Sequence, residues 1–366
     1  MFSKFFLSLV VLAVSVDAAV PSASKRTTVA CSNGKTTAND ACCVWFDVLD
    51  DIQESLFHGG ECGEDAHESL RLTFHDAIGF SPALTAAGQF GGGGADGSIM
   101  AHSDVETAYP ANAGLDEIVE VQRPFAIKYN VSFGDFIQFA GAVGVANCNG
   151  GPQLSFFAGR SNDSQPAPPT LGLLPSDSVD HILARFSDAG FSAAEVVQLL
   201  ISHTVGAQDK VDPSIPGAPF DSTPSDFDSQ FFVETMLNGT LVPGNGLQDG
   251  EVLSPYPGEF RLQSDFAIAR HSRTACEWQR MIADRAHMLA SFEEVMKKLS
   301  TLGFDRSALT DCSDVIPTAT GTVADPFIPA GLSLDDLQPA CSETPFPTVV
   351  TVAGCVTTIP AVPLDS

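Results

Sequence analysis

The sequence predicts a mostly α-helical protein with a large core, and three observations support this prediction. Apolar residues recur at helical spacing in several long segments, whereas no stretch shows the strict alternation of a half-buried strand. The polar residues of 64–76 fall on one face if that stretch is a helix. Finally, 44% of the 366 residues are hydrophobic, which is enough for a large core in one or two domains.

In the first half of the chain, four segments have helical spacing. They run from Asn39 to a stop at Gly59-Gly60 and over 64–76, 114–129 and 133–147. Residues 79–114 are rich in Gly, Ala and Pro and show little periodicity. We therefore expect a long functional loop between the second and third helices.

The second half begins after a proline-rich connection at 161–178. A short helix is expected at 179–187, and a capping box from Ser192 to Glu195 opens another that ends at His203. After a loop at 211–228, a long helix carries apolar residues at core spacing, namely Met288, Phe292, Val295 and Leu299. From Pro317 onward we expect no regular element.

The N-terminal end predicts export from the cell. Lys4 precedes an apolar run and then small residues, which is typical of a secretory signal peptide, and we place this peptide at 1–18. We place a propeptide at 19–26, because that stretch ends in the dibasic pair Lys25-Arg26. No other segment is long and apolar enough to span a bilayer, so we expect an extracellular protein without a membrane partner.

Charge and cysteine usage fit an exported protein. The net charge is −27, and it becomes −29 without residues 1–26, which hold three basic residues and one acidic residue. Such a chain repels nucleic acid and favours small cations, although an acidic surface also serves solubility alone. Nine cysteines indicate disulfides with one sulfur left over. Candidate glycosylation sites are Asn130, Asn162 and Asn238.

The stretch Glu64–Asp76 holds residues for two sites on one helix. Glu64, Glu68, Arg71 and His75 are spaced to form a single polar stripe. A neutral histidine can take a proton from a bound acid, and a fixed guanidinium can stabilise the developing negative charge. Taken alone, such an Arg–His pair is more often a surface arginine beside a core histidine. Two glutamates at i and i+4 are more often a solvated helix face.

A second histidine favours the functional interpretation. His203 ends an apolar helix, and a histidine whose other nitrogen donates to a carboxylate such as Asp265 suits a metal-bound imidazole. Together, the motifs R-L-T-F-H-D and I-S-H-T-V-G resemble the distal and proximal signatures of the plant-type haem peroxidase superfamily. More narrowly, they resemble those of the secreted fungal class II peroxidases. The resemblance runs from about Cys31 to Pro347.

The resemblance implies a fold with haem between two helical halves. The distal half would span 27–165, the proximal half 166–312 and an extended C-terminal tail 313–366. Four family disulfides are implied, Cys31–Cys43, Cys42–Cys312, Cys62–Cys148 and Cys276–Cys341, and Cys355 matches none of them. Two structural calcium sites also belong to the pattern.

The resemblance further implies roles around a non-covalent haem b. His203 would bind the iron, supported by Asp265 and Phe220. His75 would move a proton across hydrogen peroxide while Arg71 promotes cleavage of the O–O bond. The remaining distal residues implied are Phe74, which packs on the haem, Asn112, which orients His75, and Glu106, which holds Asn112.

Two oxygen-rich clusters match the implied calcium sites, although each alone would more often be a turn. Calcium is a hard cation that takes carboxylate, hydroxyl and carbonyl oxygens. The first cluster is Asp76, Gly94, Asp96 and Ser98. The second is Thr204, Asp221, Thr223, Asp226 and Asp228. Each cluster includes the residue that follows a haem-site histidine.

The resemblance also implies a manganese site. In this family Mn(II) lies beside a haem propionate between two glutamates and an aspartate, which match Glu64, Glu68 and Asp209 here. Three carboxylates suit a hard divalent ion. The surface tryptophan through which related enzymes oxidise bulky aromatics is replaced by Gln198, so we expect that route to be absent.

The implied function is that of a secreted, monomeric, short-tailed manganese peroxidase. Hydrogen peroxide would drive oxidation of Mn(II) to Mn(III), and dicarboxylate chelates of Mn(III), such as oxalate, would attack phenolic lignin. Three alternatives remain open at this point. They are a generic low-potential peroxidase acting directly on small phenols and dyes, a versatile-type peroxidase with another surface radical site, and a non-enzymatic haem or calcium protein.

Overall fold

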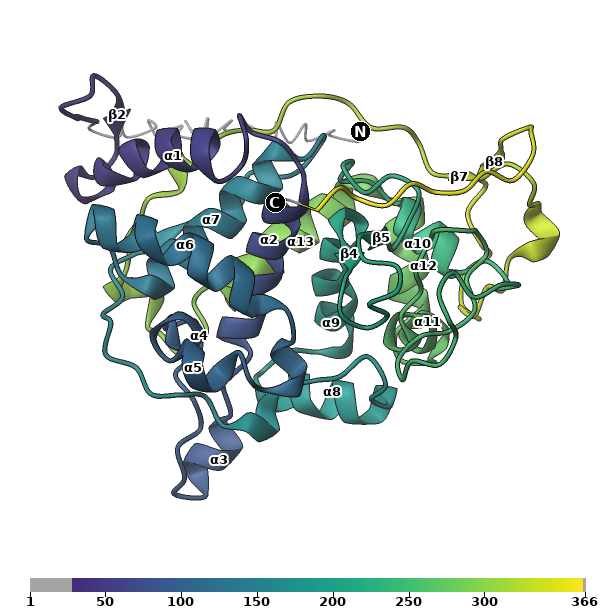
Figure 1. Ribbon diagram of the computed structural model, residues 1–366, viewed down its shortest axis with the longest axis horizontal. Coiled ribbons are helices and arrows are strands. Elements are labelled where there is room, and N and C mark those ends of the chain that lie inside the picture. Colours follow the sequence, from purple (N-terminus) through teal and green to yellow (C-terminus); the bar gives the residue numbers. More distant parts are fainter. Residues whose placement is uncertain (1–27, 365–366) are drawn as a thin grey trace, which may run out of the picture.

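A computed structural model describes residues 28–364, so the expected signal peptide 1–18 and propeptide 19–26 lie outside the described residues. The fold is mostly helical, which confirms the predicted class (Figure 1). The helices before the central connection are α1 Val44–Ser55, α2 Glu64–Ala77, α3 Pro82–Ala86, α4 Ser98–Ala101, α5 Ser103–Glu106, α6 Leu115–Tyr129 and α7 Phe133–Asn147. Those after it are α8 Val179–Asp188, α9 Ala193–Leu199, α10 Gln230–Thr235, α11 Gln263–Arg270, α12 Ala275–Ala283 and α13 Arg285–Leu299.

Short elements complete the described chain. The 3-10 helices are η1 Asp40–Cys42, η2 Pro110–Asn112, η3 Pro169–Leu171, η4 Leu200–Val205, η5 Arg306–Ala308, η6 Ser313–Val315 and η7 Leu334–Asp336. Two-residue strands form three antiparallel pairs, β1 Val29–Ala30 with β2 Thr36–Thr37, β3 Phe157–Ala158 with β6 Thr310–Asp311, and β4 Ala207–Gln208 with β5 Ala218–Pro219. One parallel pair joins β7 Phe327–Ile328 to β8 Val350–Thr351 in the tail.

The structure differs from the sequence prediction in four places. The tail from Pro317 onward, where no regular element was expected, contains β7, η7 and β8. The helix expected to end at His203 keeps its capping box but is α-helical only to Leu199, and the histidine lies in the tighter η4. The expected loop 79–114 contains the short helices α3, α4 and α5 (Figure 1). The prediction also missed α10, α11 and α12, which are 6 to 9 residues long and pack against one another. Tertiary packing stabilises helices too short to be marked by periodicity.

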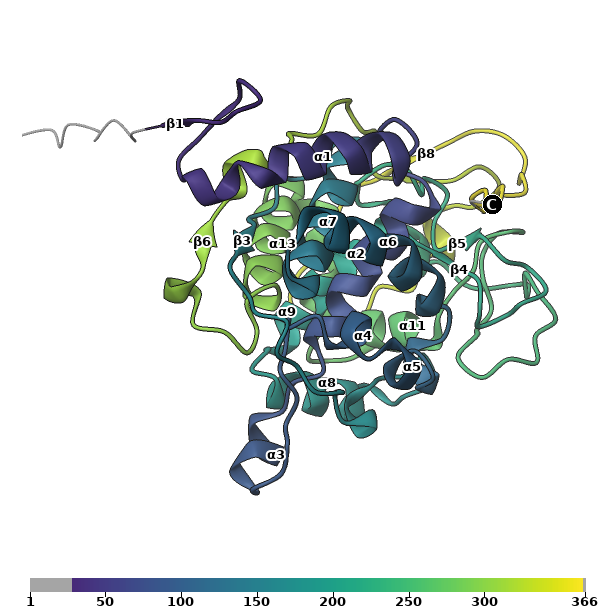
Figure 2. The ribbon, with the colours of Figure 1, turned by 60° about the vertical axis from the view of Figure 1, so that its left-hand side comes forward.

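Helices α2 and α7 approach each other unusually closely (Figures 1 and 2). A Cβ atom on Gly141 of α7 would lie 2.2 Å from Cγ2 of Thr73, and one on Gly144 would lie 2.9 Å from the carbonyl oxygen of Ala66. Almost the whole of α7 is buried, from Gly134 to Ala146. This central helix therefore sets the position of α2 and of the polar side chains that α2 carries.

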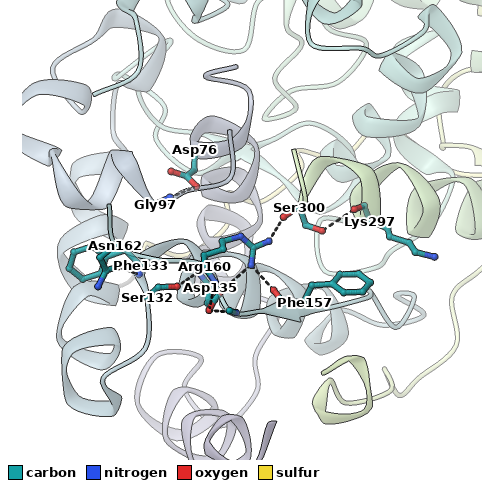
Figure 3. A network of polar contacts seen from close by, with 11 residues as sticks. Asp76, Gly97, Ser132, Phe133, Asp135, Phe157, Arg160, Asn162, Lys297 and Ser300 are labelled. Carbon is teal, nitrogen blue, oxygen red and sulfur yellow. Dashed lines mark hydrogen bonds and ion pairs between the residues drawn. The ribbon is translucent and has the colours of Figure 1, made fainter. Parts of the chain in front are cut away.

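A buried ion pair fixes the start of α7 (Figure 3). Arg160 Nη1 lies 2.6 Å from Asp135 Oδ1, and Oδ2 of the same aspartate accepts a hydrogen bond from the backbone N–H of Gly159 at 2.7 Å. The guanidinium also donates to the carbonyls of Phe157 and of Ser300, just beyond the end of α13. The pair thereby ties the central helix to the loop after it and to the last long helix.

The four expected disulfides are confirmed, each joining the predicted pair of cysteines. Cys355 is free and exposed. In the described part of the chain, no helix combines the length and apolar character needed to cross a membrane.

We predict that Gly141→Ala destabilises the protein by about 1–3 kcal/mol, the usual cost of overpacking a dense core. The new methyl group must displace Thr73 and with it α2. A matched control is Gly63→Ser at the N-cap of α2, where an added Cβ meets nothing within 4 Å and a serine suits the extended backbone. Denaturant unfolding of both variants checks the prediction, and equal stability of the two would contradict it.

Candidate functional site

A cavity of about 650 Å³ lies between α2 on one side and α9 with η4 on the other. Most of its wall is apolar, including Ile182, Phe186, Leu199 and Val205. Nine residues predicted for the site line the cavity: Glu64, Glu68, Arg71, Phe74, His75, His203, Asp209, Phe220 and Asp265. The fold thus gathers residues that are about 200 positions apart in the sequence.

His75 lies in the last turn of α2 and is oriented by Asn112. Its Nδ1 is 2.9 Å from Oδ1 of Asn112, whose Nδ2 donates to the backbone carbonyl of Glu106 at 2.9 Å. The expected hold of Glu106 on Asn112 is therefore made by the main chain and not by the carboxylate. Burial, together with the positive charge of Arg71, lowers the pKa of His75 to about 3. The imidazole is consequently neutral at ordinary pH and can accept a proton.

Arg71 points along the same face and is held by a backbone oxygen. Its Nη2 donates to the carbonyl of Ala113 at 2.9 Å, and its Nη1 lies 4.0 Å from Oε1 of Glu68. The contact with Ala113 could not be predicted from the sequence, because any residue at this position would offer the same backbone carbonyl.

His203 faces the cavity from the other side. Its Nδ1 is 2.9 Å from Oδ2 of Asp265, a residue in the first turn of α11 that is only 1% exposed. The rings of Phe220 and Phe231 lie 5.1 and 5.7 Å from the imidazole, centroid to centroid. Phe231 was not predicted, since the apolar run of α10 has no marked period. With Nδ1 engaged, Nε2 is the nitrogen that a metal can bind.

The residues of this cavity fit a haem. An imidazole reaches it from each side, apolar side chains form the wall, and Phe74 extends that wall beside His75 with their ring centroids 5.3 Å apart. Phe74 is itself stacked on Phe186 at 5.7 Å. Such a donor set suits a flat apolar macrocycle whose iron takes one nitrogen ligand.

Three carboxylates at the cavity influence one another. The pKa of Glu68 is raised to about 8, first by burial and then by the negative charges of Asp209 and Glu64, against the opposing effect of Arg71. Asp209 accepts a hydrogen bond at Oδ1 from the backbone N–H of Gly217 at 2.7 Å. The carboxylates thus lie near enough to interact, and a bound cation would relieve their repulsion.

The carboxylates do not already enclose one point. Among residues 28–364, the set of three His, Cys, Asp or Glu ligand atoms within 4.8 Å of one another is Cys62, His67 and Cys148. Those two cysteines form a disulfide, so that set is not a metal site. Closing Glu64, Glu68 and Asp209 around a cation therefore requires side-chain movement.

The first predicted calcium cluster is buried beside His75. Asp76 accepts at Oδ2 from the N–H of Gly97 at 3.0 Å, and Asp96 accepts at Oδ1 from the N–H of Ser98 at 3.0 Å. Burial raises the pKa of both aspartates, and for Asp76 the negative charge of Asp96 adds to the effect. A Cβ on Gly94 would lie 2.1 Å from the carbonyl of Leu302, so only glycine fits there.

The second predicted calcium cluster is buried behind His203. The hydroxyl of Thr204 lies 3.2 Å from Oδ2 of Asp221, 3.3 Å from Oδ1 of Asp228 and 3.4 Å from the carbonyl of Asp226. Thr223 donates its N–H to Asp221 Oδ1 at 2.8 Å. Burial raises the pKa of Asp221 well above its usual range and that of Asp228 to about 7. In both clusters, neighbouring carboxyl groups are buried together, so either protons or a bound cation must offset their negative charge.

The other positions singled out in the sequence are half-buried or exposed. Gln198 donates from Nε2 to Oε1 of Glu277 at 2.7 Å. The sequon residues Asn130, Asn162 and Asn238 are all exposed.

Comparison with known proteins gives the family context. The peroxidase family model matches residues 48–284, and the model of the fungal peroxidase extension region matches residues 287–364. Versatile peroxidase VPS1 of Pleurotus eryngii is 58% identical over 92% of this chain and 91% of its own. Ligninase B of Phanerodontia chrysosporium is 52% identical over 98% of both chains. A peroxidase of Arthromyces ramosus is 54% identical over 89% of this chain and 90% of its own.

We predict that calcium removal makes stability strongly dependent on pH. Without the cation, the raised pKa values mean that the folded protein holds protons that the unfolded chain has lost. These protons stabilise the folded state. The stabilisation is complete below about pH 4, the ordinary pKa of aspartate, and for Asp228 it is lost as pH rises through about 7. Melting temperature of metal-free protein should therefore fall from acid to neutral pH.

The matching measurement is the same pH series with excess Ca²⁺. A ligand at a hundredfold its Kd adds about 2.7 kcal/mol, so the melting temperature at neutral pH should recover by several degrees. Magnesium serves as the control ion, because it demands a tighter octahedral geometry. Identical pH curves with and without calcium would show that neither cluster binds it.

Proposed function

This chain belongs to the fungal class II peroxidases, and we propose that within that family it is a secreted enzyme that oxidises Mn(II) with hydrogen peroxide. The product Mn(III), carried by small dicarboxylates such as oxalate, would oxidise phenolic lignin. The observation that carries the proposal is the acidic group Glu64, Glu68 and Asp209 on the wall of the haem cavity. Export is supported by the signal-like N-terminus and the exposed sequons.

The distal residues would handle the proton of hydrogen peroxide. When bound, haem supplies the redox centre that reduces the peroxide. His75, neutral because burial depresses its pKa, takes a proton from one peroxide oxygen and returns it to the departing one. Asn112 holds Nδ1, which leaves Nε2 for the transfer. Arg71, anchored on the carbonyl of Ala113, stabilises the negative charge that develops as the O–O bond breaks.

The proximal residues would hold the iron. Nε2 of His203 would be the ligand, and Asp265 fixes the ring through Nδ1 and makes the imidazole a stronger donor. The two calcium clusters, which we also propose as sites, adjoin His75 and His203 through Asp76 and Thr204. Each ion would thereby stabilise one side of the cavity.

The acidic rim would bind the substrate ion. Because Glu68 has a pKa of about 8, Mn(II) must displace a proton from this rim, and two further carboxylates supply hard oxygen ligands. At Gln198 the amide bonded to Glu277 offers no oxidisable ring, so we do not propose direct oxidation of bulky aromatics by that route.

A second candidate is direct oxidation of small phenols and dyes. It is favoured by another part of the cavity wall, which is apolar and is formed by Pro110, Ala111, Leu173, Leu174 and Pro175. This activity would use the same distal and proximal histidines and would not need the acidic rim.

We predict that the double variant Glu64→Gln with Glu68→Gln loses Mn(II) turnover and keeps oxidation of small phenols. The loss should exceed the roughly 10–100-fold that removal of an outer-shell partner costs, because direct ligands are lost. A matched control is Glu54→Gln, an exposed carboxylate on α1. Steady-state formation of the Mn(III) chelate and of oxidised phenol measures both activities.

A reference variant separates the two steps of the reaction. His75→Ala should lower the turnover rate of every substrate by about 10²–10⁴-fold, since the acid–base group is gone. If the double glutamine variant still oxidised Mn(II) normally, the generic peroxidase would become the better assignment.

We predict that the two half-reactions depend on pH over different ranges. Mn(II) must displace a proton from Glu68, so its apparent affinity should rise with pH, by up to about tenfold per unit for one released proton. The reaction with peroxide should stay flat through the acidic range and slow only as pH falls toward about 3, where His75 becomes protonated. Stopped-flow and steady-state measurements over pH test this, and a pH-independent KM for Mn(II) would contradict it.

A further inference from the structure

We propose that the C-terminal segment 359–364 positions Asp209 through the backbone of Gly217 and so sets the affinity of the site for Mn(II). The proposal rests on the function proposed above and adds a positioning element that lies 150 residues further along the chain. It starts from a continuous chain of contacts between the tail and one carboxylate.

The β4–β5 pair presents Gly217 to Asp209. The pairing register is Ala207 with Pro219 and Gln208 with Ala218, so the next residues on the two strands are Asp209 and Gly217. The backbone N–H of that glycine donates to Oδ1 of Asp209 at 2.7 Å. A short bond to a carboxylate is stronger than one between neutral groups. It leaves Oδ2 as the oxygen available to a cation.

The tail clamps the other side of Gly217. The carbonyl of Gly217 accepts a hydrogen bond from the N–H of Val362 at 2.8 Å, so this one glycine links the tail to Asp209. Gly217 has a φ of 75°, and a Cβ there would lie 2.3 Å from the carbonyl oxygen of Val362. Only glycine allows both the left-handed turn and the close approach of the tail.

A second anchor lies three residues earlier. The N–H of Ile359 donates to the carbonyl of Pro257 at 2.8 Å, and a Cβ on Gly258 would lie 2.1 Å from the carbonyl of Ile359. Ile359 is 9% exposed and Val362 is 7% exposed, whereas Val356 nearby is 45% exposed. The tail is therefore docked specifically over 359–362, where it passes close to β4 and β5 (Figures 1 and 2).

The docked segment also borders the site itself. Val362 and Leu364 line the same cavity as Asp209 and Glu68. The carboxylates must move together to enclose a cation, and a carboxylate already fixed in one orientation loses less freedom on binding. Release of the tail would free Gly217 and leave Asp209 to be ordered by the metal ion, which weakens binding without touching the peroxide chemistry.

The test uses the full-length enzyme with a single donor removed. Val362→Pro keeps an apolar residue but deletes the N–H that binds Gly217. Val356→Pro is the matched control, because this exposed tail residue makes none of the backbone hydrogen bonds described for 28–364. A shortened chain ending at Thr358 removes the whole clamp and is the second variant.

Three activities are measured on each protein: oxidation of Mn(II), as KM and kcat, the rate of reaction with peroxide, and turnover of a small phenol. We expect KM for Mn(II) to rise about threefold to tenfold in both altered chains, the effect of losing one hydrogen-bond restraint. In Val362→Pro, the kcat at saturating Mn(II), the peroxide rate and phenol turnover should match the parent, as should every value for Val356→Pro. The shortened chain also loses Leu364 from the cavity wall, so it is compared with the parent through KM for Mn(II) and the peroxide rate.

The outcomes separate this inference from the proposed function. An unchanged KM for Mn(II) in both altered chains overturns the inference while leaving the function intact. Parallel loss of all three activities also overturns it, since the segment would then support the fold and not Asp209. If the parent enzyme itself makes no Mn(III) chelate, the proposed function fails first.

Discussion

Helix α2 can approach α7 only because Gly141 and Gly144 carry no side chain, and much of the site follows from that approach. Arg71 and His75 share one rigid element with the two glutamates, so their separations are fixed by helical geometry. The central helix is held at its start by the buried pair of Asp135 and Arg160. A backbone supported in this way can keep an imidazole and a guanidinium in place without contact between them.

Crowded negative charge is the second organising feature. Glu68, Asp76 and Asp221 are each buried near other acids, and each has a raised pKa for that reason. The energetic cost of such groups falls when a cation or a proton neutralises them. The acidic clusters of this chain are therefore places where a bound cation would stabilise the fold, and the net charge of −27 is partly the sum of such places.

Sequence reasoning succeeded where the information is local. The spacing of α2 and the capping box of α9 depend on neighbouring residues, and both elements begin where predicted. The disulfide pairs came from family resemblance, since spacing alone leaves the connectivity open. What could not be predicted depends on distant backbone groups. The carbonyl of Ala113 holds Arg71 and that of Glu106 holds Asn112, and neither contact requires a particular side chain.

The same limit explains why substrate preference is harder to deduce than family. Relatives that are 50–58% identical to this chain bear the names versatile peroxidase, ligninase and peroxidase, so overall identity to this chain does not distinguish between these activities. As a proposed ligand of Mn(II), Asp209 would allow a difference in activity to arise without any change of ligand. Its Oδ1 accepts a hydrogen bond from the amide of Gly217, and the carbonyl of that glycine accepts one from Val362 of the tail. Because the segment 359–364 is remote in sequence and is bonded to Gly217 through its backbone, a change in its path would alter the proposed site while the residues of that site stay the same.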